Sequence, residues 1–373
     1  MISRILRRFE KVIIKSPKRE KQYEPNRDVL RPIKLQETDR RFPCPVANAL
    51  DALQNSWNFH DINRCPFGHD PSFLAGLGVL SFLWGLSFLF YDMALDGLSP
   101  LAVVFGRCGV AALFLLVMLR ATGVRLPRDP KLWMALAVMG LLNNALPFFL
   151  IVNGQSQPGF HGGMSSIFNS TVPLFTVIIA QFFLADEKIT IPKIAGILLG
   201  MLGVTVMLAR DAFTGQGSLL IGGSFVLMAA FSYGVAGVWA RRFGGVPPMQ
   251  IAAGQQISAT AWLVLPVFLL DKPWTYSASV PLSSWLAIAG LGIFATALAY
   301  VLFFRILRTA GATNVSLVTL LIPVWAILFN ATIRQGTLAF WETITLAQWA
   351  GMALIALGLA VLNKWIPLPG QRR

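Results

Sequence analysis

One charged side chain lies deep in the long apolar stretches of this sequence. Arg107 is eight residues into an apolar run, where burying a charge costs at least about 2.5 kcal/mol by insertion scales. Two explanations for it remain open. The guanidinium holds a carboxylate or phosphate of a ligand, or it is structural and pairs with Asp92, Asp96 or backbone carbonyls.

Prolines inside apolar runs predict where backbone groups become available. A proline within a helix frees the carbonyl four residues earlier. The prolines and the residues whose carbonyls they free are Pro147 with Asn143, Pro173 with Asn169, and Pro323 with Thr319. In a membrane, irregular backbone is tolerated where it faces protein or a wet cavity. These three polar residues, with Asn144, are therefore the first candidates to line a binding site, although their side chains could instead only satisfy the kinked backbone.

Further polar and aromatic candidates lie nearby. Ser165 and Ser166 form i,i+4 pairs with Asn169 and Ser170, so one helix carries a polar stripe. Such a stripe either lines a cavity or packs against another helix. Most tryptophans and tyrosines are expected in packing or interfacial positions. Trp84 and Tyr300 are the two expected near the cavity.

The composition indicates a membrane protein. The chain has 373 residues, of which 55% are hydrophobic and 13% are charged, against about 25% charged residues in soluble domains. We therefore predict an all-α integral membrane fold with ten transmembrane helices, each long enough to cross the hydrocarbon core. The predicted spans are 73–95, 99–120, 131–153, 162–184, 190–209, 218–240, 248–270, 283–305, 312–333 and 344–363.

The sequence contains an internal repeat. Residues 187–208 match 342–363 at nine of 22 positions, which include Glu187/Glu342 and two glycine pairs seven residues apart. The two glutamates are interpreted as turn residues, and the glycines at 196, 203, 351 and 358 as sites of close helix contact. Residues 133–148 match 285–300 at six of 16 positions.

A third match relates Pro100 and Arg107 to Pro248 and the neutral Gln255, so Gln255 is also a candidate lining residue. The predicted domains are two five-helix repeats, 73–211 and 218–364. An odd number of spans in each repeat makes their topology inverted.

Positive charge predicts the orientation. With the N-terminus inside, the loops and C-terminal tail on the inner side carry 13 Lys and Arg residues and the outer loops carry three. Cytoplasmic loops are enriched in these residues. We therefore expect a multi-pass protein of the inner membrane with both termini in the cytoplasm. The net charge of +14 is explained in this way, so no nucleic-acid partner is predicted.

Residues 1–72 differ from the rest of the chain. They carry a net charge of +5 and are interpreted as a disordered basic cytoplasmic tail, although the first 15 residues could also lie on an anionic leaflet as an amphipathic helix. Cys44, His60, Cys65 and His69 do not have the spacing of a usual zinc finger. We predict no metal site and no cofactor.

Short motifs in order resemble the drug/metabolite transporter superfamily, in its ten-helix EamA branch. They are Trp84-Gly85-Leu86-Ser87-Phe88, Ser99-Pro100 with Arg107, Pro173 with Ala185-Asp186-Glu187-Lys188-Ile189-Thr190, Gly311-Ala312-Thr313, and Pro323 with Trp341-Glu342-Thr343-Ile344-Thr345. The resemblance covers about residues 73–364. One departure is that Pro323 and Glu342 are 19 residues apart, whereas Pro173 and Glu187 are 14 apart.

The resemblance implies a secondary transporter that moves a small polar metabolite (amino acid, amine, nucleobase or vitamin-like) by alternating access, with export as the expected direction. Its partners are this substrate and the lipid bilayer, and a homodimer is an assembly that the sequence leaves open. The alternative is a non-transporting scaffold or sensor that uses the N-terminal tail. No catalytic residues are predicted, because a membrane enzyme needs clustered His, Asp, Glu or Cys at depth.

Overall fold

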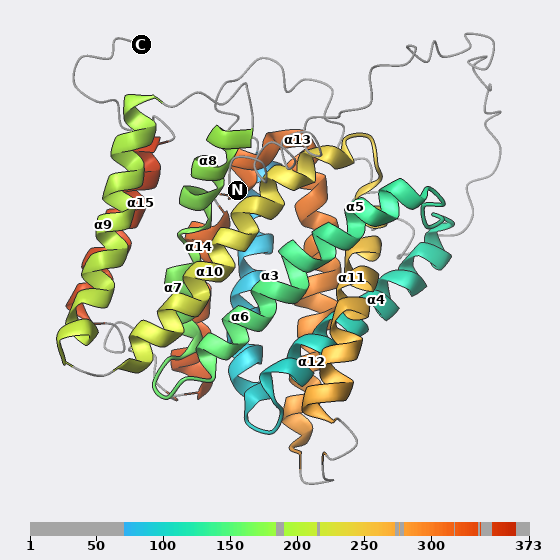
Figure 1. Cartoon of the computed structure of the whole chain (residues 1–373), viewed down its shortest axis with the longest axis horizontal. Helices are drawn as coiled ribbons and strands as arrows, with labels where there is room; N and C mark the ends of the chain where they lie inside the picture. Colours follow the sequence, from blue (N-terminus) through green and yellow to red (C-terminus); the bar gives the residue numbers. More distant parts are fainter. Residues whose placement is uncertain are drawn as a thin grey trace, which may run out of the picture. The chain divides into compact units, whose positions relative to one another are not determined.

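The computed structural model describes residues 71–183, 190–214, 217–272, 276, 280–316, 318–334, 336 and 345–362. Throughout these ranges the regular elements are helices and no strand occurs (Figure 1). The chain forms two units, and the unit from Gly76 onward is the one considered below. Residues 1–70 of the predicted tail, and the turns that carry Glu187 and Glu342, lie outside the described residues.

Each half of the chain contributes a similar series of helices. The first half contains α3 (Pro71–Leu95), α4 (Pro100–Thr122), α5 (Pro130–Gly140), the π-helical segment η3 (Leu141–Ala145), α6 (Leu146–Gln155), α7 (Gly162–Asn169), α8 (Val172–Phe183) and α9 (Ile191–Thr214). The second half contains α10 (Gly217–Trp239), η4 (Ala240–Phe243), α11 (Pro248–Pro266), η5 (Val267–Asp271), α12 (Leu282–Gly292), the π-helical segment η7 (Ile293–Leu298), α13 (Ala299–Ser316), α14 (Val318–Phe329), η8 (Asn330–Arg334) and α15 (Leu346–Leu362).

Local sequence explains several helix ends. Ser99 caps α4 by accepting a hydrogen bond from the backbone N–H of Ala102 at 3.1 Å, and Asp129 caps α5 through the N–H of Lys131 at 2.9 Å. Proline follows each cap, where its missing N–H costs nothing. Gly123 ends α4 with φ 70°, a left-handed conformation that glycine adopts without strain.

Within the described ranges, seven stretches are long and apolar enough to cross a membrane, and they correspond to the first four and the sixth to eighth predicted spans. Their bounds are Ala75–Leu95, Pro100–Thr122, Pro130–Gln155, Gly162–Phe183, Leu219–Phe243, Pro248–Asp271 and Leu282–Leu307. The other three predicted spans contain α9, α14 and α15, so the count of ten stays a prediction.

The helix α13 differs from the prediction at its end. It continues to Ser316, across the loop expected between 305 and 312. The segment 299–316 contains no proline, and three Ala, two Leu and two Arg in it favour helix. The predicted turn is therefore itself helical.

Glycines place helices from the two halves in reciprocal contact. A Cβ on Gly140 of α5 would lie 2.6 Å from the carbonyl oxygen of Gln255, and one on Gly292 of α12 would lie 2.5 Å from Val110 of α4. Gly292 and Gly140 occupy matching positions of the repeat, as do Gln255 and Arg107. Helix α5 therefore packs on α11 as α12 packs on α4.

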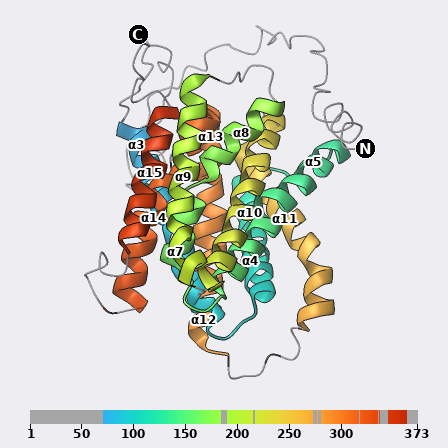
Figure 2. The same ribbon diagram turned by 60° about the vertical axis from the view of Figure 1, so that its left-hand side comes forward.

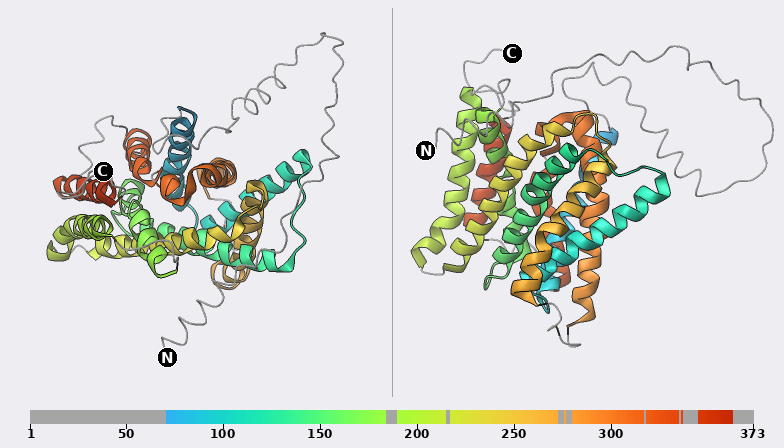
Figure 3. Two further views of the ribbon diagram at one scale, coloured as in Figure 1. Left: turned by 90° about the horizontal axis from the view of Figure 1, so that it is seen from above. Right: turned by 45° about the vertical axis from the view of Figure 1, so that its right-hand side comes forward.

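The same reciprocity occurs in the last helix of each half. A Cβ on Gly203 would lie 2.6 Å from the carbonyl oxygen of Gly351, and one on Gly358 would lie 2.5 Å from that of Gly196. The predicted close contact at these four glycines is thus confirmed. Helices α9 and α15 lie side by side along one edge of the unit, in each view (Figures 2 and 3).

The first helix of each half packs on the opposite half. A Cβ on Gly85 of α3 would lie 2.5 Å from Trp325 of α14, and one on Gly234 of α10 would lie 3.0 Å from the backbone of Thr176 in α8. Helices α14 and α8 are related by the repeat. The first helix of each half therefore packs against the equivalent helix of the other half.

We predict that Gly140→Ala destabilises the protein, because the added methyl group meets backbone atoms that cannot rotate away. Overpacking of this kind typically costs about 1–3 kcal/mol. The thermal unfolding midpoint of detergent-purified protein measures it. The control is Gly109→Ala, a helical position whose nearest neighbour would be 3.9 Å away. Equal midpoints for the two variants would contradict this contact.

Candidate functional site

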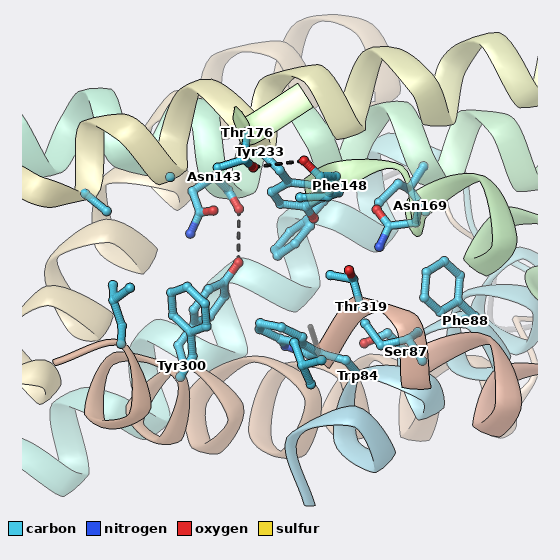
Figure 4. A pocket seen from close by; sticks show the side chains of 18 of the residues that line it. Trp84, Ser87, Phe88, Asn143, Phe148, Asn169, Thr176, Tyr233, Tyr300 and Thr319 are labelled. Carbon is cyan, nitrogen blue, oxygen red and sulfur yellow. Dashed lines mark hydrogen bonds between the residues drawn. The ribbon is translucent and has the colours of Figure 1, made fainter. Parts of the chain in front are cut away.

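A cavity of about 120 Å³ lies between the two halves. One water needs roughly 10–15 Å³ by the same measure, so the cavity has room for a small metabolite. Figure 4 shows Asn143, Phe148 and Asn169 along one wall, opposite Tyr300, Trp84, Thr319 and Ser87. These side chains come from α3, η3, α6, α7, α13 and α14.

Two aromatic side chains that were expected near the cavity meet on its wall. The rings of Trp84 and Tyr300 have centroids 6.1 Å apart in an edge-on arrangement, and Phe303 contacts both. Their faces give the cavity an apolar wall on the side of α3 and α13.

Two of the three carbonyls freed by prolines, those of Asn143 and Thr319, accept hydrogen bonds from hydroxyl groups of the opposite half. Tyr300 donates its hydroxyl to the carbonyl of Asn143 at 3.0 Å. Ser170 donates to the carbonyl of Thr319 at 3.1 Å, and Ser232 donates to that of Leu142 at 2.7 Å. The donors to the carbonyls of Asn143 and Thr319 are thus hydroxyl groups of other residues, whereas the alternative expected the side chains of Asn143 and Thr319 themselves. Their side chains nevertheless also line the cavity.

Arg107 is 3% exposed and reaches from α4 to the second half. Its Nε donates to Thr296 Oγ1 at 2.6 Å and its Nη2 to the carbonyl of Ala295 at 3.2 Å. Its Nη1 donates to the hydroxyl of Tyr91, and its guanidinium carbon lies 3.7 Å from the centre of the Phe148 ring. A backbone carbonyl was one of the structural partners expected for Arg107. Asp92 and Asp96 are not among the contacts recorded for Arg107.

Asp92 instead joins a separate polar cluster at the end of α3. Its carboxylate accepts hydrogen bonds from Gln155 Nε2 at 2.6 Å, from the N–H of Gly162 at 3.0 Å and from Asn330 Nδ2 at 2.7 Å. Asn330 belongs to the second half, so this cluster joins the two halves. None of these four residues lines the cavity.

The cavity lining runs from Phe88 and Tyr91, close to Asp92 in α3, toward the opposite helix ends. Thr176, Ala240 and Leu307 line it and lie toward the helix ends opposite to those that carry the Asp92 cluster. The Asp92 cluster thus lies outside the cavity lining, one helical turn from Phe88, which lines it.

Six of the ten predicted site residues line the cavity: Trp84, Arg107, Asn143, Asn169, Tyr300 and Thr319. Whether they contact a substrate stays a prediction. Asn144, Ser165, Ser166 and Gln255 do not line it.

The side chains of these four are engaged or buried between helices. Gln256 donates to Asn144 at 2.7 Å, Asn143 donates to Gln255 at 3.2 Å, and Ser166 donates to the carbonyl of Gly163 at 2.6 Å. Ser165 is completely buried. Ser165 and Ser166 thus lie outside the cavity wall.

Sequence reasoning missed Ser87 and Tyr233 as lining residues. Ser87 follows Trp84 by three residues, so the two share a helix face, and this spacing could have indicated it. The hydroxyl of Ser87 and the side-chain Oδ1 of Asn169 are buried without a recorded hydrogen-bond partner. Both residues line the cavity, and in both this polar atom is itself enclosed by protein.

Comparison with known proteins places this chain in a family. The model of the EamA-like transporter family matches residues 73–209 and 220–364. The chain belongs to the EamA-like transporter family. This family belongs to the drug/metabolite transporter superfamily and consists of transporters. Together with the seven apolar helices of the described ranges, the match shows a multi-pass membrane protein.

Three relatives have names that refer to transport or to a related family. The chain is 24% identical over 299 residues to the uncharacterized transporter YoaV of Bacillus subtilis, covering 76% of this chain and 94% of that protein. It is 26% identical over 298 residues to the uncharacterized inner membrane transporter YedA of Escherichia coli K12, covering 78% and 90%. It is 23% identical over 304 residues to the chloroplastic WAT1-related protein At3g02690 of Arabidopsis thaliana, covering 79% and 71%.

A solved crystal structure shares the fold. It aligns with a TM-score of 0.56 at 22% identity and covers 79% of this chain and 97% of that chain. At this identity the likeness supports the fold alone.

We predict that Tyr300→Phe destabilises the protein although it keeps the ring. The carbonyl of Asn143 would lose its recorded donor from the opposite half, and an unsatisfied buried group costs about 1–3 kcal/mol. Thermal unfolding of the purified protein measures this loss. The control is Ser224→Ala, which removes an exposed hydroxyl bonded within its own helix to the carbonyl of Leu220. A midpoint unchanged by Tyr300→Phe would show that the cross-half bond contributes nothing.

Proposed function

We propose that this protein is a secondary transporter that moves a small polar metabolite across the inner membrane by alternating access, with export as the direction. The observation that carries the proposal is the cavity at the boundary between two related halves, with the unused polar groups of Ser87 and Asn169 at its wall. Buried polar groups are rarely left without a partner, so a ligand or water is expected to satisfy them.

The position of the cavity supports a transport site. In transporters built from inverted repeats, the substrate lies near the bilayer midplane where helices are interrupted. Here the cavity wall includes Asn143 of η3, and Asn169 at the break between α7 and α8. The same helix pairs recur in both halves, as alternating access by rocking one half on the other requires.

The cluster around Asp92 supports a closed side. Opening the cavity at that end would separate Asn330 of the second half from Asp92 of the first. In this proposal that side faces the exterior and both termini are cytoplasmic, which the distribution of positive charge supports. In this orientation, the cavity lining extends toward the cytoplasmic helix ends at Ala240 and Leu307, from which an exporter would load its substrate.

We predict that Asn169→Ala reduces flux at least tenfold, because the alanine variant lacks the amide that faces the cavity. The measurement is uptake into proteoliposomes from pooled amino acids, nucleobases and vitamins, with and without a pH gradient. The matched control is Asn153→Ala, because Asn153 lies outside the cavity wall and bonds to the carbonyl of Phe149 in its own helix.

The outcomes separate the candidate functions. Saturable flux that Asn169→Ala leaves unchanged would remove this residue from the site. An absence of flux for every compound would contradict transport and favour the scaffold or sensor. Deleting residues 1–70 then provides a second test, because a transporter should retain flux without the tail and a tail-based scaffold should lose its activity.

A further inference from the structure

Arg107 is the one charged residue among those that line the cavity in the described part of the chain. No aspartate, glutamate, lysine or histidine accompanies it in that lining. The wall of the cavity thus carries a formal charge of +1. In surroundings of low dielectric constant, this charge acts strongly on any charged ligand.

The contacts recorded for Arg107 are all neutral. They are a phenol hydroxyl, a threonine hydroxyl, a backbone carbonyl and two aromatic rings. A guanidinium has five N–H groups, and each of its three nitrogens donates one recorded bond, so two N–H groups have no acceptor among these contacts. The positive charge of Arg107 is therefore not balanced by a carboxylate in the described structure.

The second half of the protein indicates that the architecture does not require this charge. Gln255 occupies the position related to Arg107 and, like Arg107, bonds to a π-helical segment of the opposite half. Asn143 is its partner there, as Ala295 and Thr296 are the partners of Arg107. At Gln255, a neutral amide is enough to join the two halves. At Arg107, the residue that joins them also carries a buried positive charge.

We propose that the cavity binds a small organic monoanion whose carboxylate lies against Arg107. This inference rests on the proposed transport function and narrows its substrate class. One guanidinium balances one negative charge, whereas a phosphate dianion would retain an uncompensated charge and an amine would be repelled. The aromatic wall of Trp84, Tyr300 and Phe303 fits an apolar body, and Ser87 and Asn169 offer neutral hydrogen-bonding groups.

The test compares matched probes that differ in charge. One series is benzoate, benzamide, benzylamine and phenyl phosphate, and the other is hexanoate, hexanamide, hexylamine and hexyl phosphate. Ligand-induced increases in the thermal midpoint of the full-length, detergent-purified protein at pH 7 report binding. We expect at least one carboxylate to act at a concentration at least tenfold lower than its amide and its phosphate, and the amines to have no effect.

Two variants test the assignment to Arg107. Arg107→Gln reproduces the residue at the related position and should abolish the preference for carboxylate over amide, while amide binding changes by less than threefold. Arg107→Lys keeps the charge and should retain the preference. Size-exclusion profiles and midpoints without ligand show whether each variant folds. If Arg107→Gln fails to fold, the charge preference of the unmodified protein and of Arg107→Lys decides the question.

Several results would overturn the proposal. They are equal binding of carboxylate and amide, a preference for amine or phosphate, the absence of binding by either carboxylate, or a carboxylate preference that survives Arg107→Gln. Flux of a neutral compound without any anion preference would remove this inference and leave the transport function standing. Carboxylate binding without flux for any compound would remove transport and leave the anion site.

Discussion

Backbone polar groups freed inside the membrane must find partners within the protein, since hydrocarbon offers none. This constraint governs the centre of the molecule. The helices around the cavity are interrupted by the π-helical segments η3 and η7 and by prolines. Tyr300, Ser232 and Arg107 each donate to a carbonyl of the opposite half. The interruptions that create a cavity are therefore also the points at which the two halves are joined.

Close helix contact makes those bonds geometrically possible. Gly140 against Gln255 and Gly292 against Val110 bring helices from different halves together beside the two π-helical segments. A side chain at either glycine would separate the helices and lengthen the hydrogen bonds nearby. Packing and polar satisfaction are thus coupled, because the small residues set the distance over which the polar side chains act.

The two halves are related, but the features that bear on function are those in which they differ. Arg107 has the neutral Gln255 as its counterpart, and Phe148 has Tyr300. The Asp92 cluster uses Asn330 from one half and Gln155 from the other at one side of the membrane unit. A common scaffold therefore provides the two-fold arrangement, while single differences between the halves give the cavity its charge and Asp92 its partners.

The π-helical segment η7 contains no proline and was not predicted, and α14 continues through Pro323. The sequence by itself determined the membrane class, the duplicated organisation and the helix interruptions beside Pro147 and Pro173. Those properties depend on composition, on identity at a fixed offset and on proline. All three can be read from the residue types and their order alone. It also identified Arg107, Asn143, Asn169 and Thr319 as polar residues at depth. It did not determine which polar residues face open space, because Asn143 and Asn144 are adjacent and the sequence does not orient them.

Only the tertiary structure shows which of those residues lie on the cavity wall. Asn144 bonds to Gln256 outside the cavity wall, whereas Asn143 lies on that wall. Ser165 and Ser166 are packed between helices, and Ser87 lies on the wall. The physical reason is that the direction of each side chain depends on helix rotation, which contacts with the other half fix. Those contacts join residues more than 100 positions apart, beyond the reach of any local pattern.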